Sequence, residues 1–137
     1  MFAFVLALQW TTPSVSACTP APGAERLGQK ALPAAIRQDL KSRVSDLSPA
    51  GGPFNATDVG SGPFTRFLTA LHVRGRYVVA YEHGGRGYHL DILTYEINDG
   101  VAKLRNHQGA ARDGLCAPLL AAETSPLPPQ PFEDRLR

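Results

Sequence analysis

The chain has 137 residues, a formal net charge of +2, 43% hydrophobic residues and 19% charged residues. This composition excludes a chain that is disordered throughout, and the weak charge argues against a dedicated nucleic-acid-binding protein, which would carry a concentrated basic patch. The length suits one domain with one core, and the abundance of Ala, Gly, Pro and Arg is typical of a bacterial protein from a GC-rich genome.

The first seventeen residues resemble an export signal. Residues 2–8 (FAFVLAL) are apolar and uncharged, and residues 15–18 (VSAC) supply the small residues of a cleavage site. The apolar run is too short to cross a bilayer, which takes ~20 apolar residues. The start lacks the usual basic residues, so an N-terminal strand or buried helix of the mature protein is the alternative. We expect residues 1–17 to be removed and the protein to be periplasmic or secreted.

Cys18 and Cys116 are the two cysteines of the chain. The VSAC sequence resembles a bacterial lipobox, which would make Cys18 the anchor of an outer-membrane lipoprotein in contact with the membrane. Cleavage after Ala17 without lipidation instead leaves Cys18 free to form a disulfide with Cys116 in an oxidising compartment. We favour the disulfide because it accounts for both cysteines, and such a long closed loop stabilises by ~4–5 kcal/mol in the chain-entropy model.

A helix is predicted over Leu32–Leu47, because apolar residues recur there on one helical face. Pro33 suits the first turn, and a run of helix breakers at Ser48–Pro53 ends the helix. The preceding segment, Thr19–Gly28, is rich in Pro, Ala and Gly and indicates a linker or an extended arm. Phe54–Pro63 is predicted to be a loop.

Four strand-like runs follow this loop. They span Phe64–Val73, Arg76–His83, Tyr88–Ile97 and Val101–His107. Arg74-Gly75 and Asp99-Gly100 suit two-residue hairpin turns, and Gly84–Gly87 joins the middle pair of strands. Leu115–Ala122 indicates a fifth strand or a short helix, and the Pro-rich composition from Thr124 onward is typical of a disordered tail.

These elements predict an α+β fold, with one N-terminal helix packed on a four-stranded antiparallel meander sheet. Residues 18–123 would form a single domain and residues 124–137 a tail. The order of helix and meander resembles the cystatin-like layout, in which a curved sheet wraps around a helix; this resemblance concerns architecture alone and implies no functional residues. Because the strands are apolar on both faces, the second face needs cover from the terminal segments, a partner chain or a ligand.

The turns also predict which residues face each other across the hairpins. The middle turn would pair Glu82 with His89, and the following turn would pair Glu96 with Lys103. Opposite charges would then meet twice, which favours this register. It places Glu82, His89 and Asp91 on one face of the sheet.

The densest polar stretch is EHGGRGYHLD, residues 82–91. Its six candidate binding residues are Glu82, His83, Arg86, Tyr88, His89 and Asp91. One interpretation is an exposed tip that presents Arg86 to a protein partner, since Arg beside Tyr and His is typical of interface hot spots. A second is a pocket at Glu82, His89 and Asp91 that binds a small ligand or performs acid–base chemistry. A third is that these residues form only a glycine-rich turn and a structural ion pair.

Other chemistry has little support in the sequence. Because the predicted register leaves His89 as the only histidine on its face, no metal site is expected, and His72 and His107 are expected to be structural. We find no nucleophile motif and expect no cofactor. The sequence therefore favours a non-catalytic exported protein that binds another protein, such as an inhibitor or immunity-type protein against a cell-wall-degrading enzyme. A small-ligand carrier or enzyme and a structural lipoprotein are the alternatives.

Overall fold

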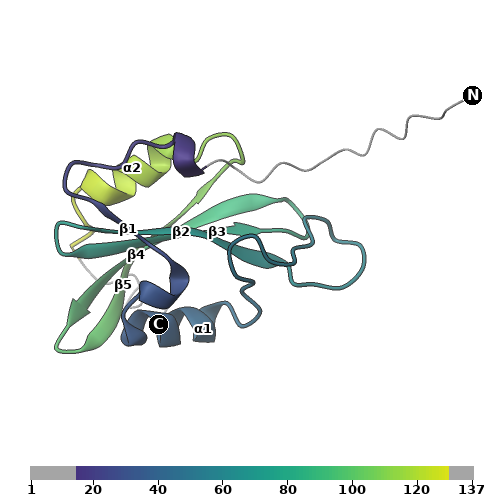
Figure 1. Cartoon of the computed structure of the whole chain (residues 1–137), viewed down its shortest axis with the longest axis horizontal. Helices are drawn as coiled ribbons and strands as arrows, with labels where there is room; N and C mark the ends of the chain where they lie inside the picture. The colour runs from purple at the N-terminus through teal and green to yellow at the C-terminus, as the bar shows by residue number, and fades with distance from the viewer. Residues whose placement is uncertain (1–14, 130–137) are drawn as a thin grey trace, which may run out of the picture.

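The computed structural model describes residues 15–129, in which a five-stranded antiparallel sheet lies between two helical layers (Figure 1). The predicted α+β class is confirmed. The helices are α1 (Ala34–Arg43) and α2 (Cys116–Thr124), with short 3-10 turns η1 (Val15–Ala17) and η2 (Gln29–Ala31). The strands are β1 (Glu25–Leu27), β2 (Thr65–Val73), β3 (Arg76–His83), β4 (His89–Asn98) and β5 (Val101–Ala110). Residues 1–14 of the predicted export signal and residues 130–137 of the predicted tail lie outside the described part.

The sheet is a meander in which each strand pairs with the next, in the order β1-β2-β3-β4-β5. Two of its turns have the conformation that their sequences predicted. Arg74 and Gly75 have φ of 52° and 74°, and Asp99 and Gly100 have φ of 50° and 76°. Positive φ at both central residues matches the right-handed twist of the flanking strands, and Gly adopts it without steric cost.

The prediction of four strands was wrong, because β1 adds a fifth. Its three residues pair antiparallel with β2, from Glu25 opposite His72 to Leu27 opposite Ala70. So short a strand, within a segment rich in Pro, Ala and Gly, shows no alternation that would reveal it. The segment from Leu115 onward, for which the sequence indicates either a strand or a short helix, contains α2, with Leu115 preceding its first residue.

The observed helix is shorter than the predicted one, which spanned Leu32–Leu47. The helix α1 covers ten residues, yet Leu32 and Val44, which flank it, are still buried with its own Ile36 and Leu40. Leu32 is extended because Pro33 follows it, and a residue before proline avoids the helical region. The predicted buried face is therefore correct, although its ends lie outside the helix.

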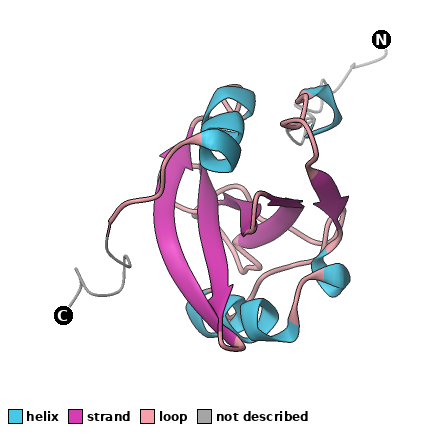
Figure 2. Ribbon diagram, turned by 90° about the vertical axis from the view of Figure 1, so that its left-hand side faces the viewer, coloured by secondary structure: helices cyan, strands magenta, loops and turns pink. Residues whose placement is uncertain are grey.

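The two faces of the sheet carry separate hydrophobic cores. On one face α1 covers the core that includes Phe67, Val79, Leu93 and Tyr95. On the other face α2 and the segment from Val15 to Ala24 cover a core that includes Leu71, Val78, Leu90 and Ile92. Figure 2 shows the helices above and below the curved strands. The sequence analysis expected the second face to be covered by the terminal segments, a partner chain or a ligand. In the structure the terminal segments cover it.

A disulfide joins Cys18 to Cys116 across 98 residues of chain, with their Cα atoms 5.0 Å apart. It fastens the N-terminal segment to the first residue of α2. Nearby, the buried Glu123 carboxylate accepts a hydrogen bond from the backbone N–H of Ala21 at 3.1 Å. The disulfide thus links the two segments that cover the second core, the N-terminal segment and α2.

The beginning of the predicted tail contacts the sheet. Arg76 donates to the carbonyl of Ser125 at 2.7 Å, and Arg105 donates to the carbonyl of Pro128 at 2.6 Å. Among the described residues, no helix has the length and apolar character needed to cross a membrane.

Candidate functional site

The six candidate residues lie at one end of the sheet, around the turn between β3 and β4. The predicted pairing of Glu82 with His89 was wrong: Glu82 faces Leu90, and His83 faces His89. The turn contains five residues, 84–88, instead of the four predicted at Gly84–Gly87, and one extra residue moves every β4 side chain to the opposite face. His83, His89 and Asp91 consequently share the face covered by α1, while Glu82 lies on the face covered by α2.

Three imidazoles surround the carboxylate of Asp91 on the α1 face. Its Oδ2 lies 3.3 Å from Nδ1 of His83 and 3.2 Å from Nε2 of His89, and its Oδ1 lies 2.7 Å from Nε2 of His107. The Asp91 side chain is 7% exposed, whereas the imidazoles are 37–45% exposed. We call these four residues the histidine cluster. It holds three of the four histidines of the chain.

The sheet pairing explains how residues so distant in sequence meet. His83 and His89 are direct partners on either side of the turn, and their rings lie 4.7 Å apart. On β5, His107 pairs with Leu93, which places it diagonally beside Asp91. Three adjacent strands thus each direct at least one side chain of the cluster to the same face.

The carboxylate of Asp91 is stabilised as an anion. Burial by itself would raise its pKa, but the hydrogen bond from His107 and the electrostatic interaction with His89 outweigh burial, so the pKa lies below its ordinary value. On the same face, burial and then the negative charge of Asp91 raise the pKa of Tyr81. The cluster is therefore an anionic group with imidazole nitrogens directed toward it.

The opposite face carries a second polar network, centred on Glu82, which is 1% exposed. Its carboxylate accepts hydrogen bonds from Nε of Arg66 at 2.7 Å and from the Tyr88 hydroxyl at 2.9 Å. The guanidinium of Arg66 lies 4.7 Å from the ring centre of Phe54, and that of Arg112 lies 4.9 Å from the ring centre of Tyr88. Burial and then the bond to Glu82 raise the pKa of Tyr88 to about 12.

The loop of residues 53–64 is braced against the β3–β4 turn. The N–H of Gly84 donates to the carbonyl of Phe64 at 2.7 Å, and the N–H of Asn55 donates to the carbonyl of Pro63 at 2.8 Å. The backbone of Asn55 passes so close to Gly84 that a Cβ there would overlap the Asn55 carbonyl oxygen. Gly84 is therefore required by a close approach of two segments.

Beyond this brace, two side chains project into solvent. Arg86 is 94% exposed at the tip of the turn, and Val59 is 77% exposed on the loop. Asp58, next to Val59, lies 3.8 Å from Nε of Arg86. We call the surface formed by Asp58, Val59 and Arg86 the tip. An exposed apolar side chain and an exposed arginine on two segments that are braced against each other are suitable contacts for a protein partner.

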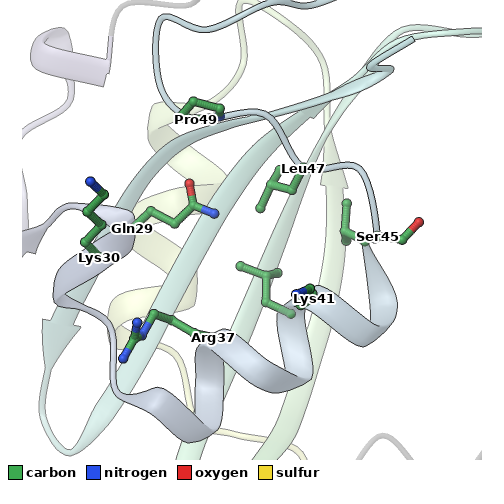
Figure 3. Close-up of a pocket in the computed structure, with 9 residues that line it drawn as sticks. Gln29, Lys30, Arg37, Lys41, Ser45, Leu47 and Pro49 are labelled. Atoms are coloured by element: carbon green, nitrogen blue, oxygen red, sulfur yellow. The ribbon is translucent and has the colours of Figure 1, made fainter.

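A separate groove of about 420 Å³ lies beside α1. Figure 3 shows residues of η2, α1 and the segment after α1 arranged around it. Its apolar lining includes Leu40 and Leu47, and three basic residues, Lys30, Arg37 and Lys41, also line it. Its size falls within the ~300–1,000 Å³ of small-molecule sites.

Sequence reasoning missed several residues of these sites. It treated His107 as structural, and it did not connect Arg66, Arg112 or Val59 to the turn. Only the spacing of histidines near strand ends could have indicated the cluster, and that signal needs the correct register. The fourth histidine, His72, lies elsewhere, stacked on Tyr77 with ring centres 4.2 Å apart.

The structure divides the pocket that the sequence predicted at Glu82, His89 and Asp91. It brings His89 and Asp91 together, but the sheet separates them from Glu82. No protein-family model matches this chain, no curated protein matches it, and no solved structure matches it. Its function is therefore inferred from the geometry of the histidine cluster, the Glu82 network, the tip and the groove.

Proposed function

We propose that this chain is an exported protein that binds a protein partner through the tip. The disulfide supports export, because such bonds persist in oxidising compartments such as the periplasm or the medium and are rare in the cytosol. The bridge uses the Sγ atom of Cys18 that a lipid would need. A soluble periplasmic or secreted form therefore agrees better with the disulfide than a lipoprotein does.

The binding proposal rests on one observation. Val59 and Arg86 are both largely exposed, and the two segments that carry them are braced against each other. A contact surface binds with less entropic cost when its backbone is ordered before the partner arrives. The hydrogen bond from Gly84 to Phe64 and the buried Glu82 network provide that order. Arginine is common among the few residues that dominate interface energies, and an adjacent apolar contact excludes water from it.

The partner class that we propose is a cell-wall-degrading enzyme, with this chain acting as an inhibitor or immunity-type protein. Glycosidases of this kind carry paired carboxylates in a cleft. The exposed guanidinium group of Arg86 suits such a cleft, although the carboxylate of Asp58, 3.8 Å away, offsets its charge in the free protein. The small size of the chain and its expected export also suit this role.

The experiment starts with a pull-down from envelope extract, identification of the captured protein, and affinity measurement with that protein purified. Arg86→Ala should weaken binding by ~2 kcal/mol or more if Arg86 is a central anchor, and Val59→Ala should also weaken it. Val101→Ala, at the opposite end of the sheet and 53% exposed, and Lys41→Ala on α1 are the controls. Melting temperatures of all four variants should stay near that of the unmodified protein.

Unchanged affinity in both tip variants would contradict the proposal, as would an equal loss in the Val101 control. The captured protein would then bind another surface, and the groove beside α1 would be the first to examine.

A further inference from the structure

We propose that His83, His89 and Asp91 bind a divalent transition-metal ion, with zinc as the preferred ion, and that His107 positions Asp91 for this. Histidine nitrogens and a carboxylate oxygen are ordinary ligands of zinc. This proposal concerns the α1 face of the hairpin and does not depend on binding of a partner by the tip.

The separations of the ligand atoms agree with one shared ion. Two ligand atoms of a tetrahedral zinc ion lie about 3.3–3.4 Å apart when the metal bonds are ~2.0–2.1 Å long. Oδ2 of Asp91 lies 3.3 Å from Nδ1 of His83 and 3.2 Å from Nε2 of His89. All three ligand atoms lie within 4.8 Å of one another. Binding of one ion requires the two imidazoles to rotate until their ligand atoms are also at this separation.

The hydrogen bond of His89 to the backbone indicates which of its two ring nitrogens could bind a metal ion. Its Nδ1 lies 2.8 Å from the carbonyl oxygen of Gly87, and since a carbonyl only accepts hydrogen bonds, Nδ1 must carry a proton. In the neutral imidazole, Nε2 then directs a lone pair toward the carboxylate of Asp91. Two acceptors at 3.2 Å require a positive charge between them. A metal ion can supply that charge, and so can a second proton on His89, which is the source of its electrostatic interaction with Asp91 in the metal-free chain; metal titration distinguishes the two.

Partners outside the ligand set hold two of the ligands in place. The carbonyl of Gly87 fixes the ring of His89, and His107 holds Oδ1 of Asp91 at 2.7 Å, leaving Oδ2 for the ion. Metal-binding histidines and carboxylates commonly have such hydrogen-bond partners, and removing one costs about 10–100-fold in metal affinity. We therefore assign His107 as a positioning residue.

The surroundings suit an accessible ion. The ligands come from the paired ends of β3 and β4, so their backbone is fixed by the sheet. Asp91 is nearly buried, whereas His83 and His89 are 45% and 42% exposed, so an ion on their outer side would contact solvent. Three protein ligands and one open position form the arrangement in which zinc also binds water or an external ligand.

The test uses the full chain with its disulfide intact, purified without a polyhistidine tag and stripped of metal with a chelator. Titration calorimetry with Zn²⁺ should show one saturable site per chain. Co²⁺ should give the visible d–d absorption of a tetrahedral ion, and Zn²⁺ should abolish it. The imidazole NMR signals of the three cluster histidines should shift with Zn²⁺, while those of His72 stay in place.

Variants assign the ligands. His83→Ala, His89→Ala and Asp91→Asn should each lower the association constant by about a hundredfold or more, and His107→Gln by about 10–100-fold. His72→Ala, which removes the remaining histidine, is the matched control and should bind normally. Circular dichroism checks that each variant folds, and His89→Gln replaces His89→Ala if the alanine variant unfolds.

Three results would overturn the proposal. One is the absence of saturable Zn²⁺ and Co²⁺ binding to the unmodified chain, which would leave a protonated histidine cluster as the explanation. The second is retention of the site in a variant lacking both His83 and His89. The third is an equal loss of binding in His72→Ala.

Discussion

Arg66 and Glu82 are direct partners across β2 and β3, and the Nε atom of Arg66 lies 2.7 Å from Oε2 of Glu82. The Glu82 side chain is 1% exposed and that of Arg66 is 14% exposed. The ion pair therefore has little access to water, and protein groups solvate both charges: the Tyr88 hydroxyl donates to Glu82, and Arg66 donates to the carbonyl of Gly52. It also joins the strand that follows the 53–64 loop to the strand that leads into the tip.

Glu82→Ala should lower the free energy of unfolding by about 3 kcal/mol or more, because it leaves the guanidinium of Arg66 poorly solvated and without its partner carboxylate. The control is Glu96→Ala. Glu96 also pairs with an arginine at 2.7 Å, but its side chain is 27% exposed. We expect a loss under ~1 kcal/mol there. Urea unfolding measures both, and equal losses would show that burial of Glu82 has no special role.

Tyr88 predicts how stability depends on alkaline pH. Its pKa is raised from 10.0 to about 12 in the folded chain, by burial first and then by the bond to Glu82. Because the folded-state value is the higher one, the stabilising contribution is complete below pH 10 and is lost as the pH rises through about 12. Tyr88→Phe should be less stable than the unmodified protein at pH 8.

The difference in unfolding free energy between these two proteins should narrow steadily above pH 10. The raised pKa values of Tyr81 and Tyr95 affect both proteins equally and so cancel in this comparison. Urea unfolding at several alkaline pH values tests it. A constant difference would contradict the assignment of the raised pKa to Tyr88.

The Cys18–Cys116 bridge predicts a large effect of reduction. Protein recovered from the envelope should begin at Cys18 and have no free thiol, which intact-mass analysis and thiol counting test.

Replacing both cysteines with serine should lower the free energy of unfolding by ~4–5 kcal/mol, because the bridge joins residues that are 98 positions apart in sequence. A reductant should destabilise the natural chain to a similar extent and leave the double variant unchanged. Retention of Met1 would argue against export, and a loss under ~1 kcal/mol would argue against a stabilising bridge.

The sequence by itself determined the elements whose cause is local. The apolar face through Ile36 and Leu40 follows from helical spacing, and the turns at Arg74-Gly75 and Asp99-Gly100 follow from residues that adopt positive φ. Apolar residues on both faces of the strands indicated that both faces need cover. These signals act over a few residues, so no knowledge of the fold is needed to interpret them.

Only the tertiary structure decided the register around the tip and therefore the sites. A five-residue turn instead of a four-residue turn exchanges the faces of β4. The 53–64 loop, distant in sequence, packs against this turn at Gly84. That exchange moves Asp91 away from Glu82 and places it among His83, His89 and His107. The histidine cluster needs three strands aligned at once, and this alignment is a property of the packed sheet because no single segment contains it.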